Sequence, residues 1–141
     1  MIRAVIDTKV LVSALISPSG NEALILLAVR QGLIKPYFST EILQEYAEVL
    51  SRPKFGFPPD QIEALIALMQ SQGEEGRPDL LSSGSPDPAD EKFLACAKTA
   101  VVEFIVTGNK RDFPPKAAAD IGVVNAAQPL DRIALEISSG V

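Results

Sequence analysis

Carboxylate side chains are the groups in this sequence that are best suited to chemistry. The chain contains no histidine, which removes the commonest general base and every zinc arrangement that needs imidazole. Three acids and one amide stand beside apolar segments, namely Asp7, Glu45, Asp90 and Asn109. Acidic clusters mainly hold Mg²⁺ or Mn²⁺, which are hard cations that take oxygen ligands. Any catalysis is therefore expected to rest on carboxylates.

Asp7 stands where a predicted strand meets a predicted helix. The unbroken apolar run before it predicts a strand over about residues 3–7 that is covered on both faces. Apolar residues then recur at helical spacing over about residues 9–16. Because ligands of open α/β sheets bind outside the carboxyl ends of the strands, Asp7 is a candidate site residue. The alternative is that Asp7 only caps the helix.

Glu45 is the acid that faces inward on a helix predicted over about residues 41–51, which Ser39 or Thr40 would cap. At about 100° per residue, Glu45 lies on the edge of the apolar stripe, whereas Glu41 and Glu48 point away from it. The stripe consists of Ile42, Leu43, Tyr46, Val49 and Leu50. The alternative is a boundary glutamate whose methylene groups cover apolar surface while its carboxylate reaches water.

Asp90 lies in the first turn of a helix predicted to open at Asp87. Its position falls near the middle of the apolar stripe, while Glu91 and Lys92 fall outside the stripe. The stripe consists of Phe93, Leu94, Ala97, Ala100 and Val101. A metal-binding role is one explanation for this buried-face charge, and stabilisation of an anion by the helix N-terminus is the other.

A second apolar run, residues 104–106, predicts a strand that ends in Thr107-Gly108-Asn109. These polar residues are either site residues or a simple turn. Before the surface connection, the sequence also predicts an almost wholly apolar, buried helix over 21–31, a strand over 36–38 and a helix over 60–71. The surface connection covers 71–88 and includes one short strand. Toward the end of the chain the sequence predicts a short helix over 116–120, an edge strand over 122–124 and a helix over 131–138.

Composition predicts one globular domain over residues 1–141, with 47% hydrophobic residues and a formal net charge of −5. This charge argues against non-specific coating of nucleic acid, but it does not exclude an acidic metal site acting on RNA. The longest apolar stretch, residues 23–29, is far shorter than the roughly 20 residues that span a bilayer. With a single cysteine, Cys96, and no leader-like segment, a cytoplasmic protein without membrane contact is expected.

Four short motifs occur in a fixed order: Ile6-Asp7-Thr8 with Val10-Leu11-Val12-Ser13-Ala14, Ile42-Leu43-Gln44-Glu45-Tyr46, Asp90 with Phe93-Leu94 and Ala97, and Ile105-Val106-Thr107-Gly108-Asn109. In this order and spacing they resemble the motifs of the PIN-domain nucleases, most closely the VapC-like toxins of toxin–antitoxin systems. The resemblance extends from residue 2 to about residue 130.

The resemblance implies a three-layer α/β/α fold with a central parallel sheet of four to five strands, and a metal-dependent endoribonuclease that uses Mg²⁺ or Mn²⁺. It makes Asp7, Glu45 and Asp90 the metal ligands and places Asn109 in the position of a fourth acid. The residues Thr8, Ser13 and Thr107 would supply supporting hydroxyl groups. The implied partners are an RNA substrate, an antitoxin protein and a second copy of the chain.

Two departures from the family pattern bear on activity. Lys9 stands where the family usually has asparagine, and Asn109 stands where it often has aspartate. We expect the charge of Lys9 to weaken metal binding, unless the side chain turns outward or contacts a substrate phosphate. Asp112 is a candidate replacement carboxylate. The alternative function is a catalytically weakened RNA- or partner-binding module, whereas an aspartyl phosphatase would require an acid at position 9.

Overall fold

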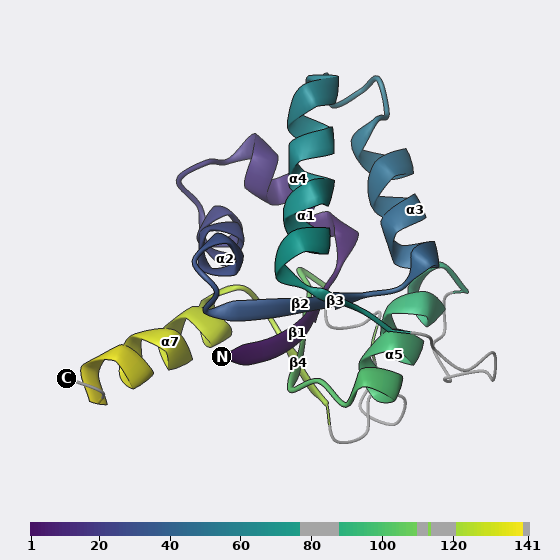
Figure 1. The fold of residues 1–141 in the computed structure, drawn as a ribbon. Helices are drawn as coiled ribbons and strands as arrows, with labels where there is room; N and C mark the ends of the chain where they lie inside the picture. Colours follow the sequence, from purple (N-terminus) through teal and green to yellow (C-terminus); the bar gives the residue numbers. More distant parts are fainter. Residues whose placement is uncertain (77–87, 110–112, 114–120, 140–141) are drawn as a thin grey trace.

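The computed structural model describes residues 1–76, 88–109, 113 and 121–139, with the side chains of 88–90 and 136–139 excepted. Its elements are shown in Figure 1. In chain order they are β1 (Ile2–Ile6), α1 (Thr8–Ile16), α2 (Asn21–Arg30), β2 (Ile34–Phe38), α3 (Thr40–Leu50), α4 (Pro59–Gln72), β3 (Glu74–Glu75), α5 (Pro88–Ala100), β4 (Phe104–Val106), β5 (Gly122–Val124) and α7 (Ala127–Ser139). The predicted alternation of strands and helices is confirmed.

The five strands form one parallel sheet in the order β3-β2-β1-β4-β5. The chain builds outward from β1 through β2 to β3, then returns to place β4 on the other side of β1. This reversal makes the carboxyl ends of β1 and β4 the topological switch point, where open α/β sheets bind their ligands. Ile6 pairs with Val106 at that edge, so the residues that follow these two strands are neighbours.

Helices cover both faces of the sheet because strand-to-strand crossovers are right-handed and the direction of winding reverses at β1. Figure 1 shows α1, α2, α3 and α4 above the sheet, with α5 at the lower right of the view and α7 at the lower left. The central strands are accordingly apolar and buried, with Ala4, Val5, Ile6, Ile105 and Val106 all fully or almost fully enclosed. This three-layer α/β/α arrangement confirms the predicted fold class.

Helix α3 follows its sequence pattern closely. Ile42, Tyr46 and Leu50, spaced four residues apart, are fully buried. The Ser39 hydroxyl caps the helix by accepting a hydrogen bond from the Ile42 amide at 3.3 Å. The Tyr46 hydroxyl donates to the Ile6 carbonyl at 2.5 Å, which ties α3 to the end of β1. The helix face that carries Glu45 is therefore fixed relative to the switch point.

Several expectations need correction. Helix α2 is not fully buried, because Leu24 and Leu27 are 44% and 43% exposed. Val101 does not extend the apolar stripe of α5, since the helix ends at Ala100 and Val101 takes a left-handed backbone with φ of 53° and faces solvent. The closing helix begins at Ala127 rather than at residue 131. The expected short helix at 116–120 and the Leu80-Leu81 pair lie outside the described residues.

Within the part of the chain that the structure describes, no single helix is long and apolar enough to cross a membrane. Taken together, α1 and α2 reach the required length and composition, but the chain bends by 105° between them.

Candidate active site

The first element of the site is a buried carboxylate at the switch point of the sheet. Asp7 directly follows β1 and is 2% exposed, and Thr107 directly follows β4 and is 1% exposed. The Thr107 hydroxyl donates a hydrogen bond to Asp7 Oδ2 at 2.7 Å and accepts one from the Asn109 amide at 3.1 Å. A charge taken out of water at this position is costly unless something compensates it.

Helix capping does not explain Asp7. The residue occupies the N-cap position of α1, but its side chain makes no capping hydrogen bond. Asp7 instead lines a cavity of about 480 Å³ together with Glu45. The predicted juxtaposition of an acid from a strand end and an acid from α3 is thus present in the structure.

This cleft lies between α1 and α3. Helix α1 contributes residues four positions apart, α3 contributes Glu45 and Val49, and Arg52 lies two residues beyond the end of α3. The residues that line the cleft are Asp7, Thr8, Lys9, Val12, Ser13, Glu45, Val49, Arg52, Lys54 and Phe55. Of the three residues expected to supply supporting hydroxyl groups, Thr8 and Ser13 line the cleft. The third, Thr107, is not among the lining residues but donates a hydrogen bond to Asp7.

Glu45 is held by two side chains from different helices. The Thr8 hydroxyl donates to Glu45 Oε2, and the Lys92 ammonium lies 2.8 Å from Glu45 Oε1. The carboxylate is only 15% exposed and Lys92 26% exposed, so this ion pair is mostly shielded from water. Glu45 thus faces inward as predicted, while Glu41 and Glu48 are exposed. Lys92 was expected outside the apolar stripe of α5, and its role in the site was missed.

Two buried titratable groups near the acids stay protonated. Burial, followed by the negative charge of Asp7, raises the pKa of Tyr46 well above its usual value of 10, so its hydroxyl remains a donor to the Ile6 carbonyl. Burial, followed by the charge of Glu41, raises the pKa of the Cys96 thiol to about 12. A thiol that is buried and protonated is inert as a nucleophile, which leaves the chemistry to the carboxylates.

The other predicted site residues are less completely placed. Asp90 lies in the first turn of α5, two residues before Lys92, but its side chain is not among those described. Asn109 is exposed and follows Thr107 by two residues. Asp112 lies outside the described residues. Among the residues that the structure describes, no three acidic or cysteine side chains converge in a group that could hold a metal ion.

Sequence reasoning also missed the basic and aromatic end of the cleft. Arg52, Lys54 and Phe55 lie in the segment that joins α3 to α4, for which the sequence predicts no helix or strand. A loop has no periodicity that would reveal which of its side chains face a site. The only available signal was the local density of cationic and aromatic residues in Arg52-Pro53-Lys54-Phe55.

A family model described as "PIN domain" matches residues 3–111, which include Asp7, Glu45, Asp90 and Asn109 and exclude Asp112. No curated protein matches the chain.

Proposed function

Since this chain belongs to the PIN-domain family, whose members are typically metal-dependent nucleases, we propose that it is an endoribonuclease that requires Mg²⁺ or Mn²⁺. The observation that carries the proposal is the buried Asp7 carboxylate, which shares one cleft with Glu45 at the switch point of the sheet. Carboxylate oxygens that share a cleft are the ligands that Mg²⁺ and Mn²⁺ prefer in proteins. The site therefore has a physical use for a divalent ion.

The donor set fits such an ion. Mg²⁺ is commonly held by one or two carboxylates, with waters and substrate phosphates completing its shell. Asp7 and Glu45 supply two carboxylates, and we propose Asp90 as a third ligand because it lies in the first turn of the helix that sends Lys92 to Glu45. When bound, the ion would activate a water for attack on the phosphodiester and neutralise charge on the leaving oxygen.

The remaining side chains would support these ligands. Thr8 and Thr107 orient Glu45 and Asp7 by donating hydrogen bonds to them, and Ser13 lines the same cleft. Ligand carboxylates are usually fixed by such partners. We propose that Asn109 takes the place of a fourth acid and that Asp112 is a reserve carboxylate.

The biological setting that we propose is a toxin of a type II toxin–antitoxin pair, VapC-like and acting in the cytoplasm. An antitoxin protein would restrain it by covering the cleft. The exposed apolar side chains of α1 and α2, Ile16, Leu24 and Leu27, support a homodimer contact, since they are 60%, 44% and 43% exposed.

A second candidate is a catalytically weakened module that binds RNA or a protein partner. The Lys92 ammonium favours it, because it already neutralises Glu45 without a metal. Lys9, which lines the cleft, adds a further positive charge. The retained Asp7 carboxylate opposes this candidate.

Removal of divalent metal is the test that separates the two candidates. We expect a mixed RNA pool to be cut in Mn²⁺ or Mg²⁺, and cutting to stop when a chelator is added, because two carboxylates alone cannot stabilise the charge of the leaving oxygen. Cleavage is measured by gel electrophoresis of end-labelled RNA. Cutting that persists in chelator, or no cutting in any metal by folded protein free of antitoxin, would count against the nuclease.

Two glutamates on α3, three residues apart, provide a matched test of the site. We expect Glu45→Gln to weaken Mn²⁺ binding at least tenfold, since it removes a charged ligand from the cleft, and Glu48→Gln to leave binding unchanged, since Glu48 is exposed. Isothermal titration calorimetry measures both affinities. On α5, Asp90→Asn is expected to weaken Mn²⁺ binding as Glu45→Gln does, and Glu91→Gln is expected to leave it unchanged as Glu48→Gln does. Equal effects from all four variants would contradict the proposed ligand set.

A further inference from the structure

The cleft continues past the two acids to a basic and aromatic end, formed by Arg52, Lys54 and Phe55 of the segment that joins α3 to α4. We call these three residues the loop patch. The chain as a whole has 18 acidic and 13 basic residues. The cleft reverses this balance, because it is lined by two acids and three basic residues, the third being Lys9. An anionic ligand is therefore favoured at this site over the rest of the surface.

The spacing between the acids and the loop patch suits a chain of nucleotides. Glu45 lines the cleft from α3, and Arg52 lines it from two residues beyond the end of that helix at Leu50. From Glu45 to Leu50 the helix extends about 7.5 Å at 1.5 Å per residue, which is about the axial length of two stacked nucleotides at 3.4 Å each, and Arg52 follows beyond that point. A strand whose phosphodiester lies at Asp7 and Glu45 would thus bring a nucleotide two or three positions away to the patch.

The aromatic residue of the patch, Phe55, is stacked on a second ring that lies outside the patch. Phe55 and Phe57 lie 5.3 Å apart between ring centroids at an interplanar angle of 9°, on either side of Gly56, whose φ of +64° makes the tight turn possible. Phe55 also lines the cleft. The Lys54 ammonium lies 5.1 Å from the centroid of the Phe55 ring. Aromatic rings combined with cations in a groove are typical of proteins that bind single-stranded nucleic acid.

We propose that the loop patch binds single-stranded RNA, with an unpaired base stacked on Phe55 and the neighbouring phosphates bound by Arg52 and Lys54. The nucleotide bound there lies two or three positions from the bond that is cut. Both cations are available to phosphate at small cost, since Lys54 is exposed and the ion pair that the structure describes for Arg52, with Glu48 at 3.4 Å, is exposed to solvent. The identity of the ligand as RNA rests on the proposed function.

Binding is tested without cleavage. Fluorescence anisotropy in chelator follows a labelled, unstructured RNA of about 12 nucleotides, which is within the range of single-strand site sizes. We expect Phe55→Leu to weaken binding about 5- to 150-fold, the loss typical of one stacked base, and Phe55→Tyr to bind as the native chain does, because the ring is kept. Circular dichroism and thermal unfolding verify that each variant is folded.

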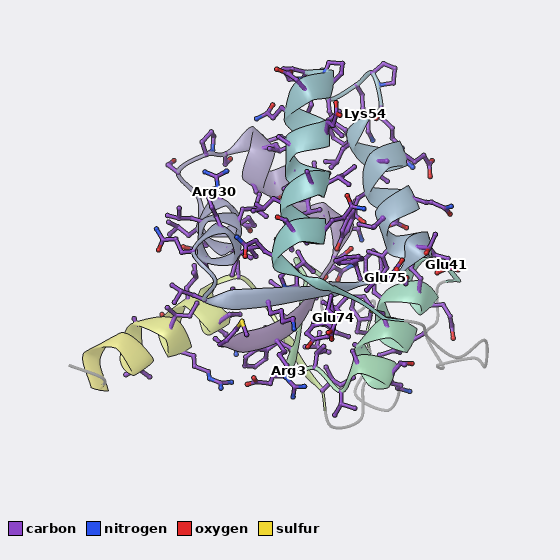
Figure 2. The ribbon with its side chains drawn as sticks, viewed as in Figure 1. Arg3, Arg30, Glu41, Lys54, Glu74 and Glu75 are labelled. Carbon is purple, nitrogen blue, oxygen red and sulfur yellow. The ribbon has the colours of Figure 1, made fainter. Side chains whose placement is uncertain are left out.

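The cations are tested by salt dependence. The double variant Arg52→Gln/Lys54→Gln is expected to reduce the slope of log affinity against log salt by about 1.4, the value for two phosphate contacts with a single strand. Arg30→Gln is the matched control, since Arg30 is exposed at the end of α2, away from the loop that carries Lys54 (Figure 2). It is expected to leave the slope unchanged.

The inference is overturned if folded Phe55→Leu binds the RNA as tightly as the native chain, or if a duplex of the same sequence binds as tightly as the single strand. Failure of the proposed nuclease is a separate result. If the chain binds RNA through Phe55 but cuts it in no metal, the loop patch is supported and the nuclease proposal is contradicted. If the chain cuts RNA in a metal-dependent way and Phe55→Leu does not change the cutting at any RNA concentration, the nuclease proposal is supported and the loop patch is contradicted.

Discussion

Replacing Asp7 with asparagine is expected to lower RNA cleavage in Mg²⁺ or Mn²⁺ by about 1,000-fold or more, which corresponds to a loss of about 4 kcal/mol of transition-state stabilisation. Asparagine has nearly the same shape as aspartate and can still accept the hydrogen bond from the Thr107 hydroxyl. What it removes is the negative charge that would hold the ion at the switch point. The rate constant for cleavage of a defined RNA, measured with saturating metal, gives this effect directly.

The fold is expected to tolerate the Asp7→Asn change. It removes a charge that is 2% exposed and that raises the pKa of Tyr46, so the midpoint of thermal unfolding without metal should be equal to that of the native chain or higher. Asp60→Asn is the matched control, since Asp60 is exposed at the start of α4 and its loss should leave cleavage unchanged. A folded Asp7→Asn variant that keeps a tenth of the native rate would rule out Asp7 as a metal ligand.

The parts of the site that lie on regular elements could be predicted from sequence. The unbroken apolar run of β1 indicates a strand buried on both faces, which places Asp7 at its carboxyl end. The period of α3 separates Glu45 from Glu41 and Glu48, and the structure agrees for all three. In both cases one geometric rule connects sequence position to direction, so no knowledge of the neighbouring elements is needed.

The parts that depend on long side chains or loops could not be predicted. Lys92 lies outside the apolar stripe of α5, but its flexible four-carbon chain carries the ammonium back to Glu45. The loop patch lines the cleft from a segment outside any helix or strand, where no periodic pattern encodes the direction of a side chain. One short strand was expected within residues 71–88, but its position was not predicted, because β3 consists of Glu74 and Glu75, a residue type with low β propensity, and forms through backbone pairing with Tyr37 and Phe38.

The ion pair between Lys92 and Glu45 leads to the second large expected effect. A unit charge at about 4 Å contributes about 4 kcal/mol at an effective dielectric constant of 20, and Lys92 lies 2.8 Å from Glu45 Oε1 with both groups mostly shielded. A divalent ion that binds Glu45 must therefore compete with the ammonium or be repelled by it. After discounting for partial solvent exposure and for rearrangement of the flexible lysine, we expect Lys92→Gln to raise Mn²⁺ affinity about tenfold.

The same variant is expected to be less stable when metal is absent. Without Lys92, Glu45 stays mostly shielded from water and keeps one of the two partners described for it, the Thr8 hydroxyl. This loss should lower the free energy of unfolding by about 1–3 kcal/mol. Added metal should restore the lost stability, because binding to the folded state alone stabilises it. Urea denaturation with and without Mg²⁺, beside calorimetric titration with Mn²⁺, measures both effects.

Lys9→Asn is the comparison that separates the effect of direct contact with Glu45, which Lys92 makes, from the effect of a positive charge elsewhere in the cleft. Lys9 also lines the cleft, but its side chain is exposed, so solvent screens its effect on a bound ion and we expect only about a two- to threefold gain in affinity. If Lys92→Gln instead weakens metal binding, Lys92 positions Glu45 as a ligand rather than competing for it. If Lys9→Asn changes neither metal affinity nor cleavage rate, Lys9 does not weaken the site. Lys92 is then the cation that lowers the affinity of the carboxylates for a divalent ion.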